Sequence, residues 1–73
     1  MHKTNQYKSS RKQAAYEEAL DLAAKSDLSN LAIAEIALVI ATQRKLSAHD
    51  ARRIAAQAVR VERGRRRKKE TII

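Results

Sequence analysis

Residues 31–41 read LAIAEIALVIA, and Glu35 is the only polar residue among them. The apolar side chains surround the whole axis of a helix instead of forming one stripe, and such a helix is normally buried on every side. We therefore expect a central helix at about residues 30–44, with the rest of a small domain packed around it.

The composition of the whole chain favours helix. Proline is absent, Gly64 is the only glycine, and fourteen of the 73 residues are alanine. Alanine is the best helix former, and nothing here supplies the tight turns that join strands. We expect an all-α fold of three helices, at about residues 11–25, 30–44 and 48–63. Stability must come from packing or association, because there is no cysteine and the domain is small.

Helix-capping patterns set these boundaries. A serine or asparagine that precedes a helix accepts hydrogen bonds from its free N–H groups, and an acidic or amide side chain three residues later strengthens the signal. The candidates are Ser10 with Gln13, then Ser29 or Asn30, and Ser47 with Asp50. On the first helix, we expect Tyr16, Leu20 and Ala23 or Ala24 to face inward. Residues 1–10 would form a flexible basic arm, residues 11–63 the helical domain and residues 64–73 a basic tail, with the third helix fading near Gly64.

The central helix also predicts association. Two neighbouring helices leave part of its apolar surface uncovered, and a second copy of the chain would cover it. We expect a homodimer whose interface contains Leu31, Ile33, Ile36, Leu38 and Ile40. The alternative is a monomer in which the first helix and the alanine-rich faces close around the central helix.

The positive charge is confined to the two ends of the chain. Residues 44–73 hold eleven Lys and Arg against three acids, and residues 1–12 hold four Lys and Arg against none. Residues 13–43 carry a net negative charge. Cationic residues at this density repel one another and indicate a polyanionic partner such as a nucleic acid.

The third helix separates its apolar and cationic residues at 100° per residue. Ala51, Ile54, Ala55, Ala58 and Val61 cluster on the expected inner side. The opposite side holds His49, Arg53, Ala56, Gln57, Arg60, Arg63 and Arg67. This pattern predicts an amphipathic helix with a cationic outer side.

Residues 40–54, IATQRKLSAHDARRI, resemble the core of a helix-turn-helix motif. The motif's apolar, small and capping positions are occupied by Ile40, Ala41, Leu46, Ser47, Ala51 and Ile54. Lys45 stands where the motif's turn usually has glycine. The resemblance implies that the third helix enters the major groove of DNA, with contacts near its amino end from Ala48, His49, Arg52, Arg53 and Ala56.

We accordingly expect a small dimeric DNA-binding transcriptional regulator in the cytoplasm or on the nucleoid. The residues predicted to contact nucleic acid are Ser47, His49, Arg52, Arg53, Gln57, Arg60, Arg63, Arg65, Arg66, Arg67, Lys68 and Lys69, together with Lys3, Lys8, Arg11 and Lys12 of the amino end. The alternatives are an RNA-binding protein that uses its arginine-rich end, and a helical module that modulates a protein partner.

Other functions find little support in the sequence. No nucleophile is accompanied by a base, so we expect neither an enzyme nor a bound cofactor. The acidic cluster at Glu17, Glu18 and Asp21 is typical of a solvated helix face, although two carboxylates at this spacing are able to hold a divalent ion. We expect no metal site and no small-molecule substrate. The chain lacks an apolar stretch long enough to span a membrane, and the non-basic side of the third helix is mostly alanine, with no Trp or Phe to insert into one.

Overall fold

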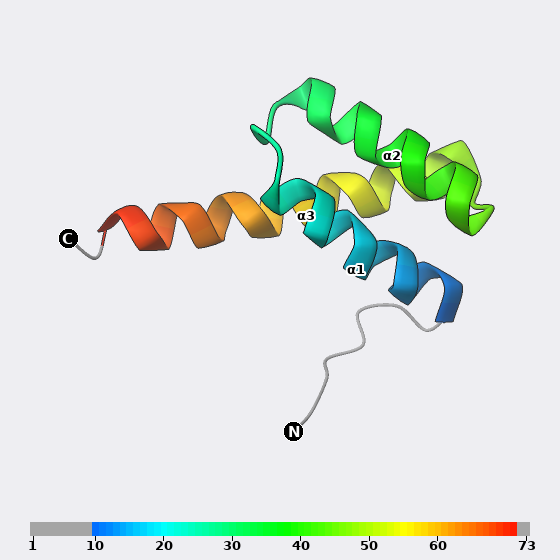
Figure 1. The fold of residues 1–73 in the computed structure, drawn as a ribbon, viewed down its shortest axis with the longest axis horizontal. Helices are drawn as coiled ribbons and strands as arrows, with labels where there is room; N and C mark the ends of the chain where they lie inside the picture. Colours follow the sequence, from blue (N-terminus) through cyan, green and yellow to red (C-terminus); the bar gives the residue numbers. More distant parts are fainter. Residues whose placement is uncertain (1–9, 72–73) are drawn as a thin grey trace.

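The computed structural model describes residues 10–71, and the side chains of residues 10–68. They form three helices, α1 (Ser10–Ala24), α2 (Asn30–Arg44) and α3 (Ala48–Thr71), as Figure 1 shows. No strand occurs within residues 10–71. The all-α prediction and the three helices are therefore confirmed. The predictions that concern Lys3, Lys8 and the side chain of Lys69 lie outside the described residues.

Two of the predicted caps are present. Ser29 precedes α2 with φ −80° and ψ 170°, and its hydroxyl oxygen accepts a hydrogen bond from the backbone N–H of Ala32 at 3.1 Å. The hydroxyl oxygen of Ser47 accepts one from the N–H of Asp50, also at 3.1 Å. Ser10, in contrast, is the first residue of α1 itself. These side chains satisfy N–H groups that have no partner within their helices.

The turn between α2 and α3 is tight although it lacks glycine. Lys45 adopts the left-handed conformation, with φ 54° and ψ 48°, and its N–H donates to the carbonyl of Ala41. The N–H of Leu46 donates to the same carbonyl at 3.1 Å. Lys45 thus takes the backbone conformation that favours glycine and ends α2 at Arg44, as predicted.

The core lies where the three helices meet and is built largely from alanine. Small side chains let the helix backbones approach closely, and Tyr16 and the larger aliphatic residues fill the remaining space. Ile40, Ile54 and Val59 are the largest fully buried side chains. The core cluster consists of Ala15, Tyr16, Ala19, Ala23, Leu28, Ile36, Ile40, Ala51, Ile54, Ala55, Ala58 and Val59.

The inward face of each outer helix differs slightly from the prediction. On α1, Ala23 is buried, Ala24 is exposed and Leu20 is only half-buried. On α3, Val59 is fully buried, whereas Val61 is half-buried. The buried side of α3 therefore turns further toward α2 than the sequence pattern predicts, because α2 supplies the larger apolar surface against which it packs.

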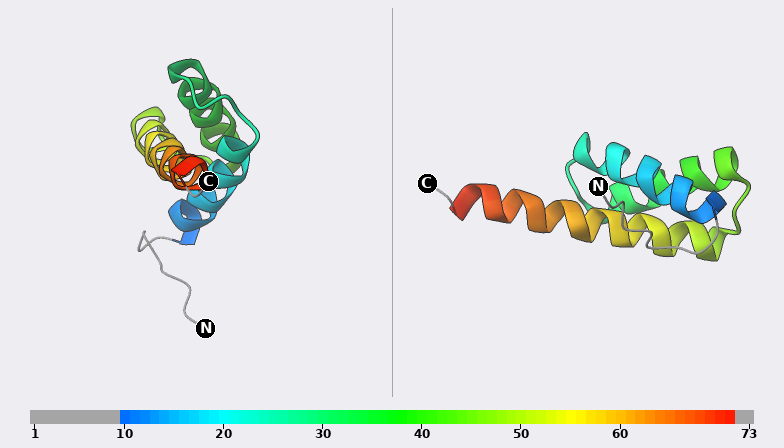
Figure 2. Two further views of the ribbon diagram at one scale, coloured as in Figure 1. Left: turned by 90° about the vertical axis from the view of Figure 1, so that its left-hand side faces the viewer. Right: turned by 90° about the horizontal axis from the view of Figure 1, so that it is seen from below.

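Gly64 does not end α3, contrary to the prediction. The helix continues to Thr71, and no atom lies within 4 Å of the place where a side chain at Gly64 would begin. A glycine costs about 1 kcal/mol in a helix interior, which the good helix formers Arg and Lys on either side can offset. Figure 2 shows that the carboxyl-terminal part of α3 extends beyond the bundle as a continuous helix.

α2 and α3 form the two arms of a helical hairpin. In Figures 1 and 2, α3 runs back along α2, and α1 packs against both. In this arrangement the outer side of α3 is exposed to solvent.

Candidate nucleic-acid interface

Six exposed residues define the outer face of α3. At 3.6 residues per turn they fall within a sector of about 80° on the side opposite the buried residues. All six are exposed to solvent. The outer face consists of His49, Arg53, Ala56, Arg60, Gly64 and Arg67.

Three arginines form a row along this face. Arg53, Arg60 and Arg67 are seven residues apart, so each step along the helix is about 10.5 Å. Within the described residues, Arg53 and Arg60 form no ion pair or hydrogen bond with an acidic side chain. The guanidinium groups of Arg53 and Arg60 are therefore available to bind an external anion.

The acids of α3 with described side chains point away from the outer face. Asp50 pairs with Lys12 of α1, with 3.7 Å between Oδ2 and Nζ. Glu62 is 9% exposed and lies between the guanidinium groups of Arg65 and Arg66, each at 3.7 Å. Among the side chains of α3 that the structure describes, those on the outer face therefore carry no negative charge.

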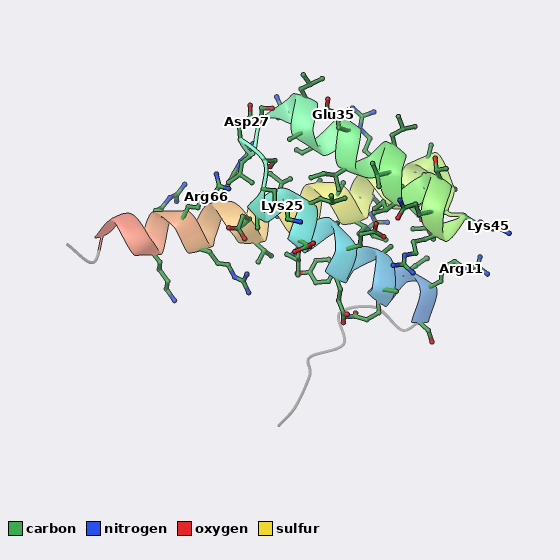
Figure 3. The ribbon with its side chains drawn as sticks, in the orientation of Figure 1. Arg11, Lys25, Asp27, Glu35, Lys45 and Arg66 are labelled. Atoms are coloured by element: carbon green, nitrogen blue, oxygen red, sulfur yellow. The ribbon has the colours of Figure 1, made fainter. Side chains whose placement is uncertain are left out.

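Arg63 and Arg66 hold the loop between α1 and α2. The Nε and Nη2 atoms of Arg63 donate to the carbonyl of Leu28 at 3.2 and 2.6 Å. Nη2 of Arg66 donates to the carbonyls of Ala24 and Ser26, both at 3.0 Å. Figure 3 shows Arg66 on the side of α3 that faces this loop. The two arginines satisfy carbonyl groups at the end of α1 and in the loop that no helix partner reaches.

The same loop contains a residue in the left-handed conformation and an exposed carboxylate. Leu28 has φ 59°, yet its side chain is buried, so the loop is held in a conformation that leucine seldom adopts. Hydrogen bonds from the side chain and backbone of Ser29, and to a smaller extent the charge of Arg66, hold the pKa of Asp27 below its ordinary value. Asp27 is therefore ionised at neutral pH.

We expect the loop contacts to contribute measurably to stability. Replacing both Arg63 and Arg66 with alanine leaves three carbonyl groups without these donors, and the expected loss is roughly 1–3 kcal/mol after allowance for solvent exposure. Urea denaturation followed by circular dichroism measures it. Arg60→Ala removes one arginine from the outer face and should change stability by less than about 0.5 kcal/mol. Equal losses of stability in the double variant and in Arg60→Ala would contradict the structural role of Arg63 and Arg66.

The structure divides the predicted contact residues into three groups. The outer face gathers His49, Arg53, Arg60 and Arg67. Others are engaged within the domain: Ser47 caps α3, Lys12 pairs with Asp50, Arg65 pairs with Glu62, and Arg63 and Arg66 hold the loop. The third group lies outside the outer face: Gln57 is half-buried, Arg52 borders α2, and Arg11 and Lys68 are exposed.

Sequence reasoning missed Glu62. One of its carboxylate oxygens, Oε1, is buried without a hydrogen bond among the described residues, although Arg65 Nη1 lies 3.7 Å away. The only signal in the sequence is the spacing of Glu62 from Arg65 and Arg66, three and four residues, which is typical of ion pairs on one helix. The buried carboxylate of Glu62 therefore neutralises part of the positive charge of Arg65 and Arg66.

The acidic residues of α1 each bind a neighbouring side chain. Glu17 accepts a hydrogen bond from Gln13 at 3.1 Å, Glu18 pairs with Arg44 at 3.0 Å, and Asp21 pairs with Lys25 at 3.5 Å. In the described part of the chain, no group of three His, Cys, Asp or Glu side chains is placed to hold a metal ion. Among the described helices, none combines the length and hydrophobicity needed to cross a bilayer.

The predicted dimer interface is only partly exposed. Ile36 is 4% exposed and Ile40 is fully buried, so both belong to the core of a single chain, and Ile33 is half-buried. These three positions lie on the side of α2 that packs against the other helices. Leu31 and Leu38 remain 69% and 70% exposed. An apolar surface on α2 is therefore present but narrower than predicted.

Comparisons of this chain with protein families, with curated proteins and with solved structures found no match.

Proposed function

We propose that this protein binds duplex DNA by placing the outer face of α3 in the major groove. The observation that carries the proposal is the continuous cationic face: Arg53, Arg60 and Arg67 repeat along one side of α3 while Asp50 and Glu62 point elsewhere. Such a face matches the regularly spaced phosphates beside a groove, and its binding energy would come largely from releasing their counterions.

The width of α3 favours a DNA duplex over an RNA duplex as the target. An α-helix with its side chains is about 10–12 Å wide, close to the width of the major groove of B-DNA, about 12 Å. The major groove of an RNA duplex is deep and narrow by comparison. The carboxyl-terminal part of α3 also extends beyond the other two helices, so α1 and α2 do not obstruct this part of its outer face (Figure 2).

In this proposal the two ends of α3 have different roles. His49 and Arg53 lie in the first two turns and contact base edges, where arginine binds the O6 and N7 atoms of guanine. Arg60 and Arg67 contact phosphates. A protein of this kind would act as a transcriptional regulator by occupying its site.

An RNA target is the second candidate, and the helical conformation of residues 64–71 favours it. An arginine-rich helix can enter an RNA groove widened by a bulge or loop. The engagement of Arg63 and Arg66 with the α1–α2 loop weighs against this alternative, because it removes two arginines from the free cationic surface.

Fluorescence anisotropy with three labelled ligands separates these functions: a DNA duplex of about 20 base pairs, an RNA duplex of the same sequence and a bulged RNA hairpin. We expect the DNA duplex to bind at least about tenfold more tightly than the RNA duplex. Tightest binding to the hairpin would establish the RNA function instead. Failure to bind any of the three at 50 mM salt would overturn both.

A further inference from the structure

α2 exposes an apolar strip with a heptad spacing. The strip consists of Leu31, Ala34, Leu38 and Ala41, separated by three, four and three residues. Leu31 and Leu38 are 69% and 70% exposed, which is unusual for leucines on a helix so apolar. A 3-4 spacing of apolar residues is the pattern with which one helix packs along another.

A shallow apolar groove borders this strip on the side of α3. It is lined by Ala34, Ala37, Leu38, Ala41, Ala48 and Arg52 and has a volume of about 240 Å³. A cavity of about 150 Å³ accepts a benzene molecule, so this groove can accept a leucine side chain. The alanines that form most of its lining permit close approach of another helix.

The strip is complementary to itself when two copies of α2 run antiparallel. With a two-fold axis opposite residue 36, Leu31 meets the partner's Ala41, and Leu38 meets the partner's Ala34. Each large side chain then packs against a small one. In a parallel pair, leucine would face leucine and alanine would face alanine, which leaves gaps beside the alanines.

The charges at the two ends of α2 favour the same orientation. Asp27 precedes the amino end of α2 and Lys45 follows its carboxyl end, as Figure 3 shows. Both are exposed, and within the described residues Lys45 forms no ion pair. An antiparallel pair places Lys45 of one chain beside the partner's Asp27 at both ends of the interface, and it also aligns the helix dipoles favourably. A parallel pair would bring like charges together.

We propose that a second copy of this chain occupies the apolar strip of α2, in an antiparallel pairing centred on residue 36. Leu38 of each chain inserts into the groove between α2 and α3 of the other. This surface lies on a different helix from the outer face of α3, so its test does not depend on nucleic-acid binding.

Sedimentation equilibrium tests the pairing. We expect the wild-type chain to dimerise in a concentration-dependent manner and Leu38→Lys to weaken the dimer by at least about tenfold, because a buried ammonium group is strongly disfavoured. Gln43→Lys adds the same charge on another side of α2, where Gln43 is exposed, and should dimerise like the wild type. Circular dichroism confirms that both variants are folded. A wild-type chain that stays monomeric at every concentration, or equal effects of the two variants, would overturn the proposal.

Cysteine variants test the orientation, since the chain has no cysteine of its own. In the antiparallel pairing, Leu31→Cys and Ala41→Cys chains that are mixed and then oxidised should form a mixed disulfide. Neither variant alone should crosslink, because two copies of one position lie about 15 Å apart along the helix axis. A disulfide requires Cα atoms closer than about 7 Å. A disulfide between two Leu31→Cys chains would establish parallel pairing and contradict the proposed one.

Discussion

Ile40→Ala is expected to remove a large part of the stability of this protein. Ile40 is fully buried and is among the largest side chains of the core. Its truncation removes buried apolar surface and leaves a cavity, which together cost about 2–5 kcal/mol. A chain of this length is stable by roughly 4–11 kcal/mol at 0.05–0.15 kcal/mol per residue, so one substitution removes much of the total.

The matched control is Leu38→Ala, on the same helix. Leu38 is 70% exposed, and at protein concentrations too low for the proposed pairing its truncation should change stability by less than about 0.5 kcal/mol. Urea denaturation of both variants at low protein concentration makes the comparison. Equal losses would mean that Ile40 lies at an exposed interface, as the sequence pattern predicts, instead of in the core of one chain.

Removing Arg53 and Arg60 together is expected to have the largest effect on nucleic-acid binding. The double variant Arg53→Gln with Arg60→Gln should lower affinity for duplex DNA by about 10²-fold, since a base or phosphate contact of this kind contributes roughly 1–3 kcal/mol. Both residues are exposed, and within the described part of the chain neither pairs with an acidic side chain, so helix content should be unchanged. Fluorescence anisotropy with one duplex at fixed salt measures the loss.

The control for this variant removes the same charge from other positions. Lys25→Gln with Arg44→Gln eliminates two cations that lie outside α3, where they pair with Asp21 and Glu18. If binding depends on the outer face, this control loses only a few-fold in affinity through the change in net charge. Equal losses in the two double variants would show that overall charge, not the row on α3, determines binding.

The features that follow from local sequence were predictable. The caps at Ser29 and Ser47 depend on residues within three positions of each serine, and the end of α2 at Arg44 follows from the turn beside it. The inner side of α3 was predicted nearly correctly because helical periodicity alone determines which residues share a side. The burial of Tyr16 follows in the same way.

The features that the sequence did not predict depend on distant parts of the chain. Arg63 and Arg66 bind carbonyl groups about 35–42 residues earlier, and a backbone carbonyl has no signature in the sequence. Those contacts lie on either side of Gly64, so they favour a continuous helix where local propensity favours an end. Ile36 and Ile40 likewise belong to the monomer core because α1 and α3 cover more of α2 than its composition suggested.

The two proposed surfaces would act together in a dimer. Pairing through α2 gives the assembly two copies of α3 related by a two-fold axis. A two-fold protein binds a site of matching symmetry, so its DNA target would contain two inverted half-sites.

The most direct test of DNA binding by the outer face is a salt titration with duplex DNA. Phosphate contacts from Arg60 and Arg67 in each chain predict a plot of log affinity against log salt with a slope of about −2 or steeper, at about −0.9 per contact. The Arg53→Gln, Arg60→Gln variant should give a slope shallower by about 1, because only Arg60 of the two contacts a phosphate. A wild-type slope near zero, or a slope that the two substitutions leave unchanged, would contradict the account.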